Sequence, residues 1–303
     1  MSCFLLLVSC LLFFPRSLFA WGPIAHLDYA SAMLENVAAF TPAVKLLLTR
    51  FPFDYLYGTL AADITLGKAY VDYIHNCHNW RVGFLILNDA EDDRQRACAY
   101  GYLSHLAVDI ISHNYFVPFK TIRSYPTRTL GHVYWEMRFD ALRPKPVWDL
   151  AKKISTMSFP HDDVLFRRML KKTLFSFKTN KQIFNSVLTL HRFEHWKTMM
   201  NKLSDISRWK FGVEDADDYR QLALDSVSRF LKDPEKAPCT LVDPTGADKL
   251  LYAKELRHDL KDLVRRRIIS EPEASRFLTK VKKALRDTIY HPGAELPSVT
   301  ELI

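Results

Sequence analysis

Three side chains that can bind metal ions recur at helical spacing in RACAYGYLSHLAVDIISHNYF, residues 96–116. His105, Asp109 and His113 stand at positions i, i+4 and i+8, along one stripe of a helix that is otherwise mostly apolar or small. A carboxylate buried in such surroundings requires a compensating charge. We therefore expect a bound cation here. The alternative is a polar stripe that neighbouring helices satisfy or that faces a water-filled groove.

The geometry of a helix separates the two histidines of this stripe. Eight residues of α-helix rise roughly 12 Å, whereas the ligands of a zinc ion lie only about 2 Å from it. His105 and His113 are therefore not expected to share one metal. We infer two ions, with Asp109 between them and able to offer an oxygen to each.

A second helix offers a similar pair. GHVYWEMRF, residues 131–139, places His132 and Glu136 at i and i+4. Alone, this spacing is typical of an ordinary intrahelical pair. Two such helices in one chain favour a shared site, and four further residues then become candidate ligands, although each by itself is typical of a cap, a surface residue or a core histidine: His26, Asp63 in GTLAADITLGK, and His75 and His78 in YIHNCHNW.

The chain begins with a predicted secretory signal peptide over residues 1–20. Residues 4–14 (FLLLVSCLLFF) are apolar but too short to span a bilayer, and the small residue Ala20 stands at a plausible cleavage position, although no Lys or Arg precedes the apolar run. Cleavage there would make Trp21 the new terminus of a secreted or periplasmic protein. The alternative is LVSC, residues 7–10, which resembles a lipoprotein box and would anchor the chain at Cys10.

Composition favours a helical protein with an anionic partner. Only 9 glycines occur in 303 residues, alongside long stretches rich in Leu, Ala, Lys and Arg, which argues for an all-α fold. The net charge of +8 favours phosphate, nucleic acid or acidic lipid. No segment after the leader approaches membrane-spanning length. Cys77, Cys98 and Cys239 would remain in the mature chain, which excludes a disulfide scaffold.

Helical periodicity recurs over residues 26–40, 92–114 and 131–142, with expected breakers at Pro52, Pro118, Pro126, Pro144 and Pro146. Further amphipathic helices follow to about residue 232, and the turn-rich residues 233–249 indicate a linker. We therefore expect one helical domain over 21–232, with its candidate ligands within 21–136, and a C-terminal helical extension over 233–303. The last helix of this extension opens with Ser270 and Glu273 at capping-box spacing.

The order of the candidate ligands identifies a family. A Trp at the mature terminus with a nearby His, a loop Asp, a further His, then HxxxD, another His and finally HxxxE together resemble the ligand set of zinc-dependent phospholipase C and the related fungal single-strand nucleases. The resemblance covers residues 21 to about 140. It implies a multi-helix fold around a buried trinuclear zinc cleft.

The resemblance also implies a role for each ligand. Trp21 would bind one zinc through its α-amino nitrogen and carbonyl oxygen, together with His26. The second zinc would be held by Asp63, His78, His105 and Asp109, which bridges to the first, and the third by His113, His132 and Glu136. His78 fits better than His75, because its fifteen-residue step from Asp63 and the following Asn79-Trp80 match the family pattern. Asp63 would in addition orient or deprotonate the attacking water.

The implied activity is hydrolysis of a phosphodiester, with a glycerophospholipid at a membrane surface as the expected substrate and metal-activated hydroxide as the nucleophile. Two departures bear on this expectation. The step from Asp109 to His113 is shorter than usual in the phospholipases, and the opening Trp21-Gly22 with His26 resembles the nucleases, whereas Glu136 resembles the phospholipases. The alternatives are a single-strand nuclease acting on nucleic acid and an inactive lipid- or phosphate-binding module. The sequence does not indicate an oligomeric state.

Three other patterns receive simpler interpretations. HRFEH, residues 191–195, has the spacing of inverted zinc peptidases, but it lacks an obvious third ligand and is explained by the exposed face of a helix. FRRMLKK and LVRRRI are expected to be solvated basic faces, with contact to anionic lipid as the alternative.

Overall fold

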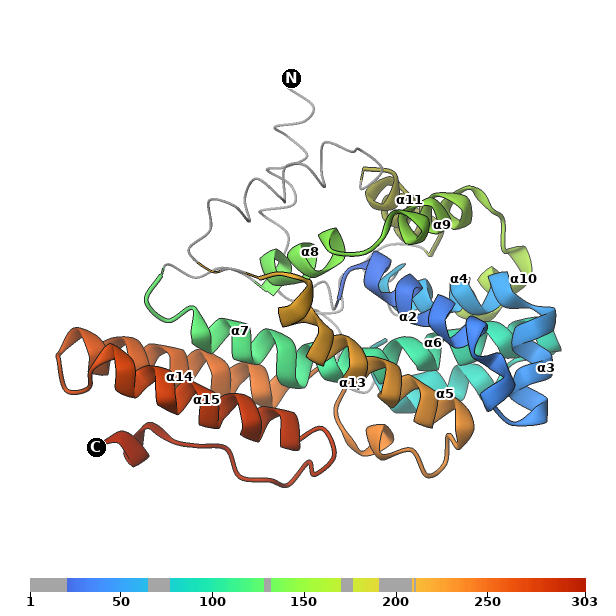
Figure 1. Cartoon of the computed structure of the whole chain (residues 1–303). Coiled ribbons are helices and arrows are strands. Elements are labelled where there is room, and N and C mark those ends of the chain that lie inside the picture. The colour runs from blue at the N-terminus through green and yellow to red at the C-terminus, as the bar shows by residue number, and fades with distance from the viewer. Residues whose placement is uncertain (1–20, 65–76, 128–131, 170–176, 191–208, 210) are drawn as a thin grey trace, which may run out of the picture.

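The computed structural model describes residues 21–64, 77–127, 132–169, 177–190, 209 and 211–303 (Figure 1). These residues form helices and no strand, which confirms the predicted all-α fold. In the first part of the chain, the helices are α2 (Pro23–Glu35), η1 (Val37–Ala39), α3 (Pro42–Arg50), α4 (Pro52–Ile64), α5 (Trp80–Asn88), α6 (Asp93–Ile111), the π-helix η4 (Ser112–Phe116) and α7 (Val117–Arg123). They are followed by α8 (His132–Ala141), α9 (Lys145–Thr156), α10 (Pro160–Met169), α11 (Phe177–Leu190), α13 (Val213–Lys232), η5 (Pro238–Leu241), α14 (Ala247–Arg265), α15 (Glu271–Asp287) and η6 (Val299–Leu302).

Helix α6 lies at the centre of the fold, and α2, α4, α5 and α13 pack against it (Figure 1). Its contact with α4 is unusually close. A Cβ on Gly58 would lie 1.9 Å from the carbonyl oxygen of Cys98, and one on Gly101 would lie 2.0 Å from that of Tyr55. Only glycine permits this approach of two backbones. The side chains that α4 and α6 direct toward each other are therefore held at a fixed separation.

The predicted helix over 92–114 begins as expected but does not end at residue 114. The side chain of Asp92 accepts a hydrogen bond from the backbone N–H of Gln95, 2.8 Å away, and caps α6. Instead of stopping before Pro118, the helix passes through one π-helical turn and continues as α7. Pro118 lies in the first turn of α7, so the expectation that it breaks the helix was wrong.

The other predicted helix ends differ by only a few residues. Helix α2 starts at Pro23, ahead of the predicted His26, because proline is favoured in the first helical turn. Helix α8, at His132–Ala141, lies within the predicted range 131–142. Pro52 and Pro146 lie at the predicted breaks, which follow α3 and α8, and they occupy the first turns of α4 and α9.

The last part of the chain packs onto the helices that carry the predicted ligands. Helix α13 contacts α6 and α2, whereas α14 and α15 lie along α7 and contact η4 (Figure 1). The predicted capping box of α15 is confirmed, since the Ser270 N–H donates to Glu273 Oε2 at 2.7 Å and the Glu273 N–H donates to Ser270 Oγ at 3.4 Å. The division into residues 21–232 and 233–303 stays a prediction.

Some predictions concern residues outside the described part of the chain, and others concern membrane spans and cysteines. The leader, His75 and His191–His195 lie outside the described residues. Within them, no helix combines the length and apolar character that crossing a bilayer would require. Cys77, Cys98 and Cys239 are buried free thiols.

Candidate metal centre

Five of the predicted ligands converge in the interior from four parts of the chain. His105 and Asp109 come from α6, Asp63 from the end of α4, and His26 from α2, while His78 precedes α5. None of the five is more than 2 % exposed. The sequence separates these residues by up to 83 positions, so only the packing of α2 and α4 on α6 brings them together.

The ligand atoms lie at the separations expected around a metal ion. The Nε2 atoms of His78 and His105 are 3.0 Å apart, and Asp109 Oδ2 is 3.1 Å from each of them. Asp63 Oδ1 lies 3.5 Å from His78 Nε2, and Asp109 Oδ1 lies 3.3 Å from His26 Nε2. Two atoms each about 2 Å from a tetrahedral zinc ion are separated by roughly 3.3 Å. The cluster therefore has the dimensions of a zinc site.

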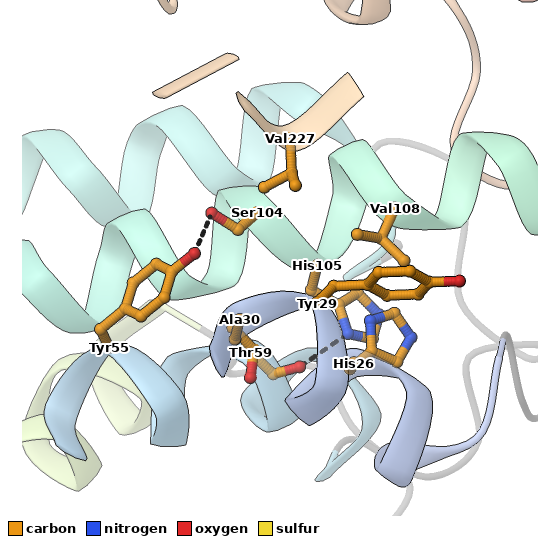
Figure 2. Close-up of a pocket in the computed structure, with 9 residues that line it drawn as sticks. All are labelled: His26, Tyr29, Ala30, Tyr55, Thr59, Ser104, His105, Val108 and Val227. Carbon is orange, nitrogen blue, oxygen red and sulfur yellow. Dashed lines mark hydrogen bonds between the residues drawn. The ribbon is translucent and has the colours of Figure 1, made fainter. Parts of the chain in front are cut away.

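Contacts on the far side of the imidazole rings orient the histidines. His105 Nδ1 lies 2.8 Å from the carbonyl oxygen of Thr59 (Figure 2). Because a carbonyl only accepts, His105 Nδ1–H must donate, which leaves Nε2 as the ring nitrogen available to a metal ion. His78 Nδ1 contacts Cys77 Sγ at 3.3 Å, and the Tyr102 hydroxyl donates to the Cys77 carbonyl. Each ring is thus held with Nε2 directed into the cluster.

The electrostatics of the cluster favour a bound cation. Neither carboxylate oxygen of Asp109 and neither ring nitrogen of His26 has a properly directed hydrogen bond among the described residues, although all four atoms are buried. Burial and the adjacent His105 lower the pKa of His26, whose ring stacks on that of His105 at 3.8 Å between centroids (Figure 2). Neutral imidazoles and a carboxylate in one dry cluster are a set of donors that fits a divalent metal ion.

Asp109 remains ionised despite its burial. Burial by itself would raise the pKa of its carboxyl group, but the electrostatic effect of the adjacent His105 and the contacts from His105, His26 and His78 outweigh burial and hold the pKa well below its ordinary value. Its two oxygens face different histidines, with Oδ1 nearer His26 and Oδ2 nearer His78 and His105. This arrangement suits a carboxylate that bridges two ions.

A second group of candidate ligands lies where η4 meets α8. His113 Nε2 is 4.0 Å from Glu136 Oε1, and both side chains are buried. His113 Nδ1 donates to the carbonyl oxygen of Pro244 at 2.7 Å, which directs Nε2 toward Glu136. Helix α8 begins at His132, whose side chain lies outside the described part of the chain. The structure thus pairs two of the three predicted ligands of the third ion.

Trp21 lies two residues before α2 and is fully buried. Its indole stacks between the rings of Tyr29 and Phe139, at 5.1 and 4.6 Å between centroids, and also contacts Phe116 at 6.1 Å. These contacts fix residue 21 between α2, α8 and η4, the helices that carry His26, Glu136 and His113. Binding of metal by its backbone stays a prediction.

The prediction from sequence missed Asp140, which holds the start of α2 in place. Its carboxylate accepts from the backbone N–H groups of Ile24 at 3.3 Å and Ala25 at 3.0 Å. Burial raises the pKa of Asp140 to about 7, against the opposing effect of these N–H donors. A signal was present, because Asp140 follows Glu136 by four residues and continues its stripe along α8.

Replacing Gly22 with Ala is expected to destabilise the protein. A Cβ at this position would lie 2.0 Å from Asp140 Oδ2, so the capping carboxylate must move and α2 loses its cap. We expect the free energy of unfolding to fall by about 1–3 kcal/mol in urea titrations. Gly293→Ala is the matched control, since nothing lies within 4 Å of its added Cβ. Equal unfolding midpoints for the two variants would contradict the role of Asp140.

A small pocket lies beside the cluster. Nine residues line it, including His26, His105, Tyr29 and Tyr55, and the Tyr55 hydroxyl donates to Ser104 Oγ at 3.1 Å across its far end (Figure 2). It leaves no room for a water molecule.

Comparison with known proteins agrees with this geometry. A family model described as zinc dependent phospholipase C matches residues 25–203, more than half of the chain, and no curated protein or solved structure matches significantly. The match spans every predicted ligand except Trp21 and ends before α13. The chain therefore belongs to the zinc-dependent phospholipase C family and is a zinc-dependent hydrolase of phosphodiester bonds.

Proposed function

We propose that this protein is a secreted phospholipase C that hydrolyses glycerophospholipids at a membrane surface. The observation that carries the proposal is the buried cluster of His26, Asp63, His78, His105 and Asp109, whose ligand atoms lie 3.0–3.5 Å from their neighbours. Family membership supports the same chemistry. The net charge of +8 suits an anionic membrane surface.

Three zinc ions would be held by the nine predicted ligands. Trp21 and His26 would hold the first, Asp63, His78, His105 and Asp109 the second, with Asp109 shared between these two, and His113, His132 and Glu136 the third. When bound, zinc supplies Lewis acidity toward the phosphodiester and toward water. The chain itself supplies a preorganised set of neutral imidazoles and ionised carboxylates.

Asp63 is the residue we assign to the proton of the attacking water. Its carboxylate is buried at the end of α4, and Oδ1 lies 3.5 Å from His78 Nε2. The water oxygen forms a new bond to phosphorus while the bond from phosphorus to the diacylglycerol oxygen breaks. The proton removed from water ends on that departing oxygen, so the products are diacylglycerol and the phosphorylated head group.

The substrate is tested by offering two phosphodiesters to the same preparation. Purified protein with zinc should release phosphocholine from phosphatidylcholine vesicles, and Asp63→Asn should reduce this rate by about 10²–10⁴-fold. Exposed Asp93→Asn on α6 is the control. Cleavage of single-stranded DNA with intact vesicles would instead establish the nuclease alternative. Vesicle binding without turnover would establish a binding module.

Secretion has a separate test. Removal of residues 1–20 would place a free amino group on Trp21, beside the buried start of α2. N-terminal sequencing of protein recovered from the medium or the periplasm should therefore begin at Trp21. Any other first residue contradicts both the cleavage site and the proposed ligation by the terminal amine.

A further inference from the structure

The turn Val242–Gly246, between η5 and α14, contacts the π-helix that carries His113. The Pro244 carbonyl oxygen accepts from His113 Nδ1 at 2.7 Å, and the Asp243 carbonyl oxygen accepts from Asn114 Nδ2 at 2.8 Å. Two consecutive side chains of η4 are thus bonded to two consecutive carbonyls of the turn. This turn lies outside the family match, which ends at residue 203.

The turn is built to hold those carbonyls in place. The Asp243 carboxylate accepts from the Thr245 N–H at 3.1 Å and from the Thr245 hydroxyl at 2.5 Å. The Gly246 N–H donates to the Asp243 carbonyl at 3.1 Å. On its other side, the Val242 carbonyl accepts from Trp80 Nε1 of α5 at 2.9 Å. The turn is therefore fixed from within and also bonded to a second helix.

Gly246 is required by both conformation and space. Its φ of +57° lies in the left-handed region, which residues other than glycine rarely adopt. A Cβ at this position would lie 2.3 Å from the carbonyl oxygen of His113. The backbone of the turn thus packs directly on the backbone of the proposed ligand.

We propose that residues 242–246 are a positioning element for the third metal site. The Pro244 carbonyl fixes the Nδ1–H tautomer of His113, so that its Nε2 faces Glu136. This inference rests on the proposed function, in which His113 is a zinc ligand. It extends the site to a part of the chain that the family match does not reach.

The test compares zinc binding in Gly246→Ala and Gly293→Ala, the second being the control at an unhindered glycine. We expect Gly246→Ala to weaken one of the three zinc sites by about 10–100-fold in chelator competition, because contacts behind a ligating histidine have effects of this size. The melting temperature of Gly246→Ala should fall more with zinc bound than without it. Asp243→Ala should also weaken zinc binding, but by a smaller factor. Asp243→Asn should bind zinc more tightly than Asp243→Ala, because asparagine keeps an acceptor for Thr245.

Each result decides the matter. Equal zinc affinities in Gly246→Ala and Gly293→Ala overturn the inference, as does an equal fall in melting temperature with and without zinc, which indicates a merely structural turn. If Gly246→Ala does not fold, the two Asp243 variants decide by the same measurements. The variant His113→Ala distinguishes failure of the positioning role of residues 242–246 from failure of the proposed function. If His113→Ala binds one zinc ion fewer than the wild type, His113 is supported as a ligand. If His113→Ala keeps the full zinc content, both the ligand assignment and the inference are overturned.

Discussion

Asp109→Asn is expected to abolish both turnover and the bound zinc of the central cluster. Asp109 Oδ2 lies 3.1 Å from Nε2 of His78 and of His105, and Oδ1 lies 3.3 Å from Nε2 of His26. Asparagine removes the negative charge and places an NH₂ group toward one set of metal-binding nitrogens. The loss should affect two proposed sites at once, because the two oxygens face different histidines.

The expected size follows from what a metal ion contributes. Stabilisation of several kcal/mol in the transition state corresponds to roughly 10³-fold or more in rate. Elemental analysis and release of phosphocholine measure the two losses in one preparation. Asp93→Asn is the matched control on the same helix, since its carboxylate is exposed and pairs only with Arg96 at 2.8 Å among the described residues. Full zinc content and full turnover in Asp109→Asn would end the proposal.

The part of the central cluster on α6 was predictable because its residues conflict with their surroundings, whereas His26, Asp63 and His78 were indicated by the family resemblance. His105 and Asp109 stand on a helix whose neighbours are apolar, and the cost of burying a carboxylate implies a partner. The structure places three imidazoles around that carboxylate, as the argument requires. Spacing within one helix carried this inference, so it did not depend on tertiary structure.

Contacts made by backbone atoms were not predictable in the same way. The carbonyls of Thr59 and Pro244 orient His105 and His113, yet every residue has a carbonyl, and its direction depends on the fold. The close approach of α4 and α6 at Gly58 and Gly101 is likewise a property of the pair of helices. A single sequence indicates candidate ligands, whereas the groups that orient them are identified only in the folded structure.

The π-helix η4 is the largest local difference from the expected helix. The sequence of residues 112–116 predicts a continuation of the α-helix, because apolar periodicity does not distinguish a single π-helical turn from an α-helical one. This turn carries His113 at the short four-residue step from Asp109. In the structure, His113 lies against Glu136. It belongs to neither of the two sets of three close ligand atoms in the central cluster, which come from His26, His105 and Asp109 and from Asp63, His78 and His105. Local backbone geometry therefore decides which partner this histidine meets.

Removal of zinc is expected to lower the stability of the folded protein sharply. Without an ion, Asp109 and His26 keep buried polar atoms that have no properly directed hydrogen bond among the described residues. A ligand that binds only the folded state stabilises it by about 4 kcal/mol per site at a concentration 1,000 times its dissociation constant. The free energy of unfolding of the wild type should therefore differ by several kcal/mol between zinc and chelator in urea titrations.

Asp109→Asn distinguishes this effect from a general effect of chelator. If the stabilisation arises at the central cluster, the variant should show a much smaller difference between zinc and chelator than the wild type. Magnesium should not restore the wild-type midpoint, because imidazole nitrogens suit zinc and magnesium prefers oxygen ligands in an octahedral arrangement. An unchanged wild-type midpoint in chelator would mean that the cluster is stable without a cation. The buried carboxylate of Asp109 would then be balanced by protonated imidazoles alone, and zinc would have no structural role at this site.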